Sequence, residues 1–326
     1  MAAPVTHEHV NAADDRAAWL AARRKGLGGS DIAAILGMNP WKTPLGVYLD
    51  KTGEMPDEPQ SHRAEWGLRL ERVILDGAVD ALNADREEPL ELATVDEILA
   101  HPDHGWMLAS LDGCLDGDPQ GPGVAEAKST SYWARQQWED GDTLPDAWHC
   151  QVQWYLAVTG WQWGVIAVLW DTANLHLEHV EADREFQSAL VEVGERFWRD
   201  HVLAGNPPAA GAGDDELTKR LHPEPEPGSS VLLPDEAREV IAERNAARAA
   251  EKHAAERRKA AEARIRQLLG DAEEGWFPGD PRPAVRFPVV ETQRLDGKAL
   301  REAHPDIAAE FTTPSTYRRL SVAEGE

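Results

Sequence analysis

Two acids and a lysine lie close together in the stretch ASLDGCLDGDPQGPGVAEAKST, residues 109–130. One apolar run contains Asp112, a turn rich in Gly, Pro and Asp follows, and a second apolar run carries Glu126 and Lys128. This pattern predicts a β-hairpin. Residues two apart on a strand face the same way, so Glu126 and Lys128 project from one face and Asp112 can lie beside them.

Two converging carboxylates form a hard-oxygen site that suits Mg²⁺ or Mn²⁺. A lysine near a metal-bound water can lower the pKa of that water or orient it as a nucleophile, and metal and lysine together balance the charge of a phosphorane-like transition state. The three residues therefore suit metal-assisted phosphodiester hydrolysis. On an ordinary surface hairpin they would be a solvated polar face, so their context must decide. Both acids lie in apolar runs, and a helical segment that carries Glu71 precedes them.

Hydrophobic periodicity and breakers predict the elements that must position these residues. A loop and a short helix follow residue 26, with Ser30 or Asp31 as the N-cap. In the helix predicted over 61–82, the apolar stripe runs through Trp66, Leu70, Val73, Ile74 and Ala78. The remaining predicted elements are helices at 12–25, 144–159 and 183–203, and strands at 106–116, 123–129, 163–170 and 174–182.

Composition divides the chain into four parts. Residues 1–205 form the main domain, and residues 206–233 are rich in Pro, Gly and acid, which predicts a linker. Residues 234–270 open with Pro-Asp and run without a breaker to Gly270, which predicts one long charged helix. Residues 271–326 alternate short β-like runs with a helical piece and are expected to form a small α+β extension.

Several classes of protein are excluded by bulk properties. The 326 residues contain no long apolar run and begin with a charged segment, so we expect no membrane span, no secretion signal and a cytoplasmic location. Two cysteines are too few for an iron–sulfur cluster, a four-thiolate zinc site or a disulfide framework. The net charge of −25 argues against a broadly nonspecific nucleic-acid binder, although the distribution of charge matters more than its sum.

Five segments, in order, resemble the YqaJ-type viral recombinase family, which is similar to lambda exonuclease: WLAARRKGLGGSDIAAILGMNPWKTPLGVYLDKTG, EWGLRLERVI, ASLDGCLDG, GVAEAKST and HCQVQWYLAVTGW. The resemblance covers about residues 16–205. It implies an α/β fold with a restriction-endonuclease-like PD-(D/E)xK core, in which a central mixed sheet is flanked by helices. The family's proline is absent, because Leu111 precedes Asp112.

The resemblance also implies roles for individual residues. Asp112, Glu126 and the backbone carbonyl of Ala127 would bind the catalytic Mg²⁺, Lys128 would position the attacking water, and Glu71 would help to hold a metal or its waters. A pocket for a 5′-phosphate would be formed by Arg23, Ser30 and Ser110. A helix beside the site would present Gln151, Gln153 and Tyr155, and because the two glutamines lie on different helical faces, we expect only one to contact metal-bound water or substrate.

Ordinary structural roles are open for several of these residues. The alternative for Arg23 is a cation at the C-terminal end of a helix, the alternative for Ser30 is a helix cap, and the alternative for Glu71 is a surface ion pair. The HPDH and HLEH sequences at 101–104 and 176–179 favour solvated or structural histidines over metal ligands. Trp133 or Trp138, in a polar segment after the Glu-x-Lys run, is a candidate for stacking on DNA, with plain packing as the alternative.

The family implies a Mg²⁺-dependent exonuclease that digests one strand of a double-stranded DNA end from 5′ to 3′ and leaves a 3′ single strand. Its expected partner is a single-strand annealing protein, and relatives often form a ring of three around DNA. One alternative is an endonuclease or nickase on the same core, which would cut closed circular DNA. Another is an acidic module that only binds recombination proteins, which would leave the presence of Asp112 and Glu126 beside Lys128 unexplained. The iron–sulfur nucleases of CRISPR adaptation are disfavoured by the cysteine count.

Overall fold

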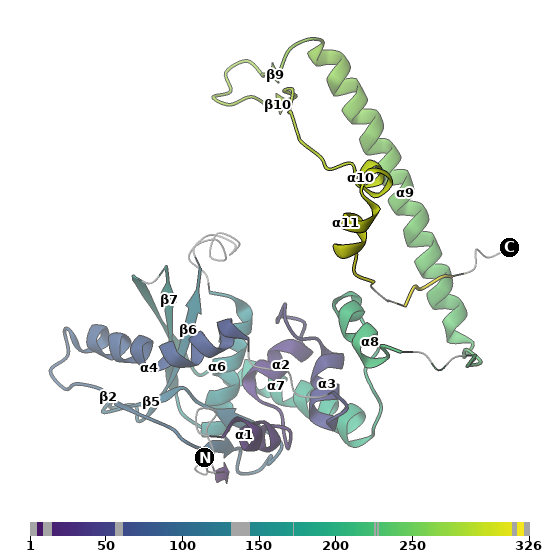
Figure 1. Ribbon diagram of the computed structural model, residues 1–326. Coiled ribbons are helices and arrows are strands. Elements are labelled where there is room, and N and C mark those ends of the chain that lie inside the picture. Colours follow the sequence, from purple (N-terminus) through teal and green to yellow (C-terminus); the bar gives the residue numbers. More distant parts are fainter. Residues whose placement is uncertain are drawn as a thin grey trace. The chain divides into compact units, whose positions relative to one another are not determined.

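The structure, a computed structural model, describes residues 5–8, 15–55, 61–131, 144–171, 173–224, 226, 228–314 and 318–322 (Figure 1). The chain divides into two compact units, Met1–Leu221 and His222–Glu326. Among the described residues, each helix is too short or too polar to cross a membrane.

A five-stranded mixed sheet forms the centre of the first unit, in the order β2-β5-β6-β7-β8. The strands pair antiparallel except β6 and β7, which run parallel and are joined by a crossover through helix α6, Asp146–Thr159. The five strands are β2 (Glu91–Ala93), β5 (Gly113–Asp116), β6 (Gly123–Thr130), β7 (Trp163–Trp170) and β8 (Asn174–Glu181). A second, three-stranded sheet has the order β1-β3-β4, with strands Val5–Glu8, Ile98–Ala100 and Leu108–Ser110.

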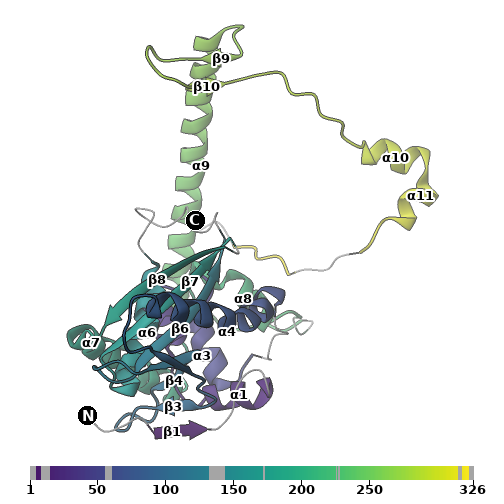
Figure 2. The same ribbon diagram turned by 90° about the vertical axis from the view of Figure 1, so that its left-hand side faces the viewer.

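Helices cover both faces of the five-stranded sheet (Figure 2). Helix α4, His62–Asn83, packs on β6 and β7 from one side, and α6 covers the other side, with α2, Gly29–Ile35, packed on α6. Alternate residues of β6 enter different cores: Ala125 and Ala127 pack with α4, whereas Val124 packs in the core on the α6 side. Glu126 and Lys128 therefore face α6, as the period of a strand requires. The expected α/β fold with a central mixed sheet and flanking helices is confirmed.

The segment 106–116 differs from the single strand that its apolar pattern predicts. It breaks after Ser110, so that β4 belongs to the three-stranded sheet and β5 to the five-stranded sheet. The hairpin itself is confirmed, because Gly113 pairs with Ala125 in an antiparallel register. Local hydropathy cannot reveal the break, since both halves are apolar and both are buried. Asp112 lies at the point where the chain passes from one sheet to the other.

The N-terminal helices differ from prediction in their caps and their number. Helix α1, Arg16–Arg23, begins after Asp15, whose side chain accepts a hydrogen bond from the backbone N–H of Ala18. The N-cap of α2 is Gly28, so the expected cap at Ser30 or Asp31 is wrong; Asp31 instead accepts from the N–H of Gly28 at 3.0 Å. A further helix, α3 (Pro44–Thr52), is capped by Thr43 and was not predicted.

The apolar stripe of α4 is turned relative to its sequence prediction. Ile74, Leu75 and Ala78 are the buried residues of the helix, whereas Trp66 and Val73 are 58% and 63% exposed. Trp66 and Val73, seven positions apart, share one side of the helix, and that side does not meet the sheet. The sheet determines which apolar side of the helix is buried.

The first unit extends past residue 205. Helix α7, Arg184–Phe197, continues into a π-helical segment, Trp198–Leu203, and helix α8, Asp215–Leu221, follows a 3₁₀ turn. Asp214 is buried, accepts from the N–H of Gly211 at 2.8 Å and bonds the hydroxyl of Thr43, and Leu217 packs against the main core. The part of the predicted linker up to Leu221 is thus folded onto the first unit, because a few specific contacts fix a segment whose composition is typical of linkers.

The second unit is built around α9, Glu236–Leu269, which confirms the predicted long helix; none of its residues is buried. Two short strands and two short helices follow: β9 (Glu274–Gly275), β10 (Val285–Arg286), α10 (Gly297–Ala303) and α11 (Pro305–Glu310). Residues 222–326 contain 16 of the 33 basic and 20 of the 58 acidic residues. Residues 1–221 therefore hold 17 and 38 and carry the charge of −21, so the acidity of the chain resides in the first unit rather than in its long helix.

Candidate active site

The break between β4 and β5 fixes Asp112 beside the Glu-x-Lys strand. The backbone N–H of Ala127 donates a 2.9 Å hydrogen bond to Oδ2 of Asp112. Glu126 is 1% exposed and lies in the middle of β6, in parallel register with Ile166 of β7. The structure therefore brings together the three residues that sequence spacing selects.

The two carboxylate oxygens of Glu126 have different surroundings. Oε1 pairs with the ammonium group of Lys128 and accepts a 2.7 Å hydrogen bond from the side-chain amide of Gln151. The same amide donates to the hydroxyl of Tyr155 at 3.0 Å. Oε2 is buried and, when both acids are ionised, accepts no hydrogen bond from a described atom. Leaving a buried carboxylate oxygen without a partner is costly, so this atom indicates a missing ligand.

Burial raises the pKa values of all three acids, and repulsion between neighbouring carboxylates adds to this effect for Glu126 and Glu71. Burial, with the charge of Asp112, raises the pKa of Glu126 to about 8. Burial, with the charges of Asp112 and Glu126, raises the pKa of Glu71 to about 8, and burial also raises the pKa of Asp112. Burial alone would lower the pKa of Lys128, but the charges of Glu126 and Asp112 outweigh it and raise that pKa. When ionised, the three acids repel one another around the charged lysine, and a bound divalent cation would reduce this repulsion.

The side chains of the site supply only some of the ligands that a hard cation requires. Within the described ranges, no group of three or more His, Cys, Asp or Glu side chains is arranged to hold a metal ion. The carboxyl groups of Asp112 and Glu126 lie within hydrogen-bonding reach of each other, and Glu71 does not complete a ready-made cluster with them. Two carboxylates with a backbone carbonyl, such as that of Ala127, suit Mg²⁺, which usually keeps several of its waters.

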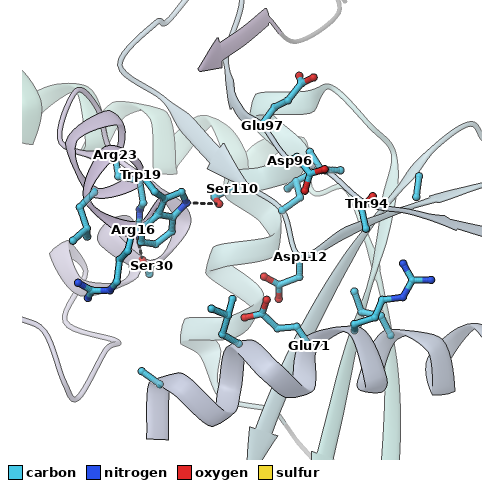
Figure 3. Close-up of a pocket in the computed structure, with 18 of the residues that line it drawn as sticks. Arg16, Trp19, Arg23, Ser30, Glu71, Thr94, Asp96, Glu97, Ser110 and Asp112 are labelled. Carbon is cyan, nitrogen blue, oxygen red and sulfur yellow. Dashed lines mark hydrogen bonds between the residues drawn. The ribbon is translucent and has the colours of Figure 1, made fainter. Parts of the chain in front are cut away.

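Hydroxyl and guanidinium groups line the other side of the same cavity. Arg23 Nη2 donates to Ser30 Oγ at 3.1 Å, and Trp19 Nε1 donates to Ser110 Oγ at 3.4 Å (Figure 3). The guanidinium of Arg23 lies over the Trp19 ring, 4.6 Å from its centroid. These residues share a cavity of about 200 Å³ with the acids, the lysine, Gln151 and Tyr155.

A larger cavity of about 660 Å³ adjoins this one and shares Arg23, Ser30 and Ser110 with it. Figure 3 shows the carboxylates of Glu71 and Asp112 turned toward one another, across the cavity from Ser30. The predicted phosphate-binding residues and the predicted metal-binding residues thus face the same cavity.

Gln153 lies away from the cavity, and its predicted contact with substrate does not fit the geometry. It is 6% exposed, its amide nitrogen donates to the carbonyl of Glu181 at 2.7 Å, and its oxygen accepts from the N–H of Asp183 at 3.0 Å. The side chain of Gln187 donates to the same oxygen at 2.9 Å. Of the two glutamines, Gln151 is the one that faces the site, and Gln153 connects α6 to β8 and α7.

Other sequence candidates are not in the site. His149 Nε2 lies 2.8 Å from a carboxylate oxygen of Glu178, and His101 accepts from the backbone N–H of Asp103 within its own turn. Trp133 and Trp138 lie outside the described residues.

Two residues of the site were not selected by sequence reasoning. Trp19 lies one helical turn before Arg23, a spacing that could have drawn attention to it. Asp31 was considered only as a cap, yet its side chain is fully buried among Arg23, Lys42 and Lys51. No local pattern marks Asp31, because its partners come from three different segments.

A mixed α/β unit in which an aspartate at a strand break meets Glu-x-Lys on the neighbouring strand has the site arrangement of the PD-(D/E)xK proteins. The model of the YqaJ-like viral recombinase domain matches residues 18–162. The uncharacterized protein YqaJ of Bacillus subtilis (strain 168) is 31% identical over 319 residues, which is 96% of each chain. The chain therefore belongs to the YqaJ-like viral recombinase family, as its five sequence segments predict.

Solved structures with a similar backbone include an alkaline exonuclease, LHK-Exo, from Laribacter hongkongensis. Its TM-score is 0.46 at 18% identity, over 63% of this chain and 96% of that chain. The complex of LHK-Exo with dAMP gives a TM-score of 0.47 at the same identity and coverage. Similarity at this level says nothing about activity, so the chemistry of this chain is inferred from its own residues.

Proposed function

We propose that this protein is a Mg²⁺-dependent deoxyribonuclease of recombination that digests double-stranded DNA ends from 5′ to 3′ and leaves 3′ single strands. The observation that carries the proposal is the unpartnered Oε2 of buried Glu126, next to Asp112 and Lys128. Mn²⁺ could replace Mg²⁺, because both ions prefer oxygen ligands.

Asp112, Oε2 of Glu126 and the carbonyl of Ala127 would hold the cation, with Glu71 near its waters. A bound Mg²⁺ would lower the pKa of a coordinated water and stabilise the charge that develops on the phosphate. Lys128 stays protonated between the acids, so its ammonium group can orient the attacking water and stabilise negative charge. Gln151 and Lys128 together fix Glu126 Oε1, which leaves Oε2 directed toward the cation.

Arg23, Ser30 and Ser110 would capture the 5′-phosphate of the strand that is digested. A guanidinium group and two hydroxyls are suitable donors to phosphate oxygens. Their place in the same small cavity as Glu126 supports cleavage close to a strand end rather than at internal positions. The 5′-to-3′ polarity rests on the family resemblance.

In cells, the exposed 3′ strand would pass to a single-strand annealing protein, and a ring of three subunits would keep the nuclease on DNA. The charge of −21 on the first unit makes nonspecific attraction to DNA weak. Capture of the strand end and enclosure of the DNA by the ring would then have to supply the binding affinity that a basic surface gives other nucleases.

Digestion of a linear duplex labelled on one strand tests the proposal. The duplex carries a 5′-phosphate or a 5′-hydroxyl and is incubated with and without Mg²⁺, with the natural protein and with Lys128→Ala. Lys219→Ala is the matched control, because Lys219 is exposed on α8 and pairs with Asp215 and Glu216. We expect Mg²⁺-dependent loss of the 5′-phosphorylated strand, retained in Lys219→Ala and abolished in Lys128→Ala.

Closed circular DNA in parallel distinguishes the alternatives. Cutting of circles would favour an endonuclease or nickase on the same core. Absence of any digestion by the folded natural protein would refute a stand-alone nuclease and favour a module that acts only through partners.

A further inference from the structure

Four cations and two carboxylates form a cluster behind the phosphate pocket, which we call the Asp31 cluster. The carboxylate of Asp31 is fully buried, with Lys42 at 3.0 Å from Oδ1, and Lys51 at 2.7 Å and Arg23 at 4.0 Å from Oδ2. Asp50 lies 2.8 Å from Lys42 and 3.6 Å from Arg24. The six members are Arg23, Arg24, Asp31, Lys42, Asp50 and Lys51.

Asp31 and Lys51 form the fixed base of the cluster. Burial alone would raise the pKa of Asp31, but the charges of Lys51, Lys42 and Arg23 outweigh it and hold that pKa well below its ordinary value. The Lys51 side chain is 1% exposed and also donates to the backbone carbonyl of Arg23 at 2.9 Å. Lys51 is therefore out of reach of a ligand and positions the end of α1.

Lys42 differs from Lys51 because it reaches the cavity. Its side chain is 29% exposed and lines the larger cavity together with Arg23 and Ser30. The contacts with Asp31 and Asp50 use two of the three N–H donors of its ammonium group. Two carboxylates thus fix the position of Lys42 and leave it one donor.

The charge of the Asp31 cluster suits a terminal phosphomonoester better than an internal phosphodiester. Its four cations and two carboxylates leave a formal surplus of two positive charges, within a unit whose net charge is −21. A terminal phosphomonoester carries close to two negative charges at neutral pH, whereas each phosphodiester within a strand carries one. A second fixed cation beside Arg23 therefore stabilises a strand end more than it stabilises internal backbone.

We propose that Lys42, held in place by buried Asp31 and by Asp50, is a second cationic ligand of the phosphate pocket and makes it selective for the terminal phosphomonoester of a DNA strand. This inference rests on the proposed function, and it assigns Asp31 as a positioning residue that acts through Lys42 and Arg23.

Equilibrium binding in the Lys128→Ala background tests the inference without digestion. Affinities are measured for two duplexes of one sequence, one with 5′-phosphate ends and one with 5′-hydroxyl ends. Lys42→Gln is expected to reduce the preference for the 5′-phosphate by about tenfold, as expected for the loss of one charge-assisted hydrogen bond, and Lys42→Arg to retain most of it. Affinity for the 5′-hydroxyl duplex should change little.

Arg24→Gln is the matched control, because it removes one positive charge from the same cluster. Arg24 contacts Asp50 but does not line either of the two cavities described above. Equal preference in Lys42→Gln and in the parent would overturn the role of Lys42, and so would an equal loss of affinity for both duplexes. The proposed end capture itself would fail if the parent protein, with Lys42 intact, showed no preference for the 5′-phosphate.

Discussion

The side-chain amide of Gln151 donates a 2.7 Å hydrogen bond to Oε1 of Glu126 and so connects helix α6 to the strand that carries the central acid. Gln153, two residues further along the same helix, faces the opposite direction and bonds the backbone at Glu181 and Asp183. The two glutamines offer a matched pair of substitutions, since they share a residue type and a helix.

Gln151→Ala is expected to reduce nuclease activity about tenfold or more and to change the free energy of unfolding by less than about 1 kcal/mol. Gln153→Ala is expected to leave the folded protein active but to lower its stability by about 1–3 kcal/mol, because the backbone groups of Glu181 and Asp183 lose a buried partner. Urea unfolding and single-turnover digestion measure the two effects. The reverse pattern would mean that Gln151 is structural.

Without divalent cations, stability should fall as pH rises from about 4.5 to about 8. Burial and neighbouring acids raise the pKa of Glu126 and of Glu71 from 4.5 to about 8, so the folded state binds more protons than the unfolded state in this window. Glu126→Gln mimics the protonated acid. It should match the natural protein near pH 5 and exceed its melting temperature near pH 8.5, both measured in a chelator.

Addition of Mg²⁺ at pH 8.5 should reverse that order, because a cation that binds only the folded state stabilises it. The natural protein should then melt higher than it does in the chelator, while Glu126→Gln should not respond. An equal response of both proteins would place the cation elsewhere.

Asp31→Asn is expected to destabilise the protein by about 3–5 kcal/mol at neutral pH, because it leaves the buried Lys51 without its closest carboxylate. The pKa of Asp31 is held well below 3.8, so its contribution is complete above about pH 3.8 and is lost as pH falls toward the folded pKa. The difference from the natural protein should be constant between pH 7 and pH 5 in urea unfolding, and should narrow below pH 3.8.

Asp50→Asn serves as the control for this effect, because Asp50 is 31% exposed and its loss leaves Lys42 paired with Asp31. A smaller destabilisation is expected. Equal losses for the two variants would contradict the central position of Asp31.

A chain that ends at Leu221 should fold, and it should melt at the temperature at which the first unit melts within the full chain. A chain that ends at residue 205 should melt lower or aggregate, because it lacks buried Asp214 and the packing of Leu217. Calorimetry of the two truncations and the full chain distinguishes these outcomes. Equal melting of the two truncations would return residues 206–221 to the role of a linker.

Local patterns determined much of this protein. The spacing of Glu126 and Lys128 placed both on one face of a strand, and the Gly- and Pro-rich turn brought the segment of Asp112 back beside that strand, because strand period and turn chemistry are properties of adjacent residues. The unbroken run before Gly270 was enough to predict α9 for the same reason. The order of five segments identified the family.

Only the tertiary structure decided which of these residues meet. Trp66 is as apolar as the other members of the predicted stripe, yet it remains exposed because the sheet packs on another side of α4. Asp31 gives no local signal, yet it gathers cations from α1, α3 and the chain between α2 and α3, because a buried carboxylate is stable only where opposite charges surround it. A short stretch of sequence determines the period and the turns of its own backbone, whereas burial and charge pairing depend on segments that are far apart in the chain and meet only when it folds.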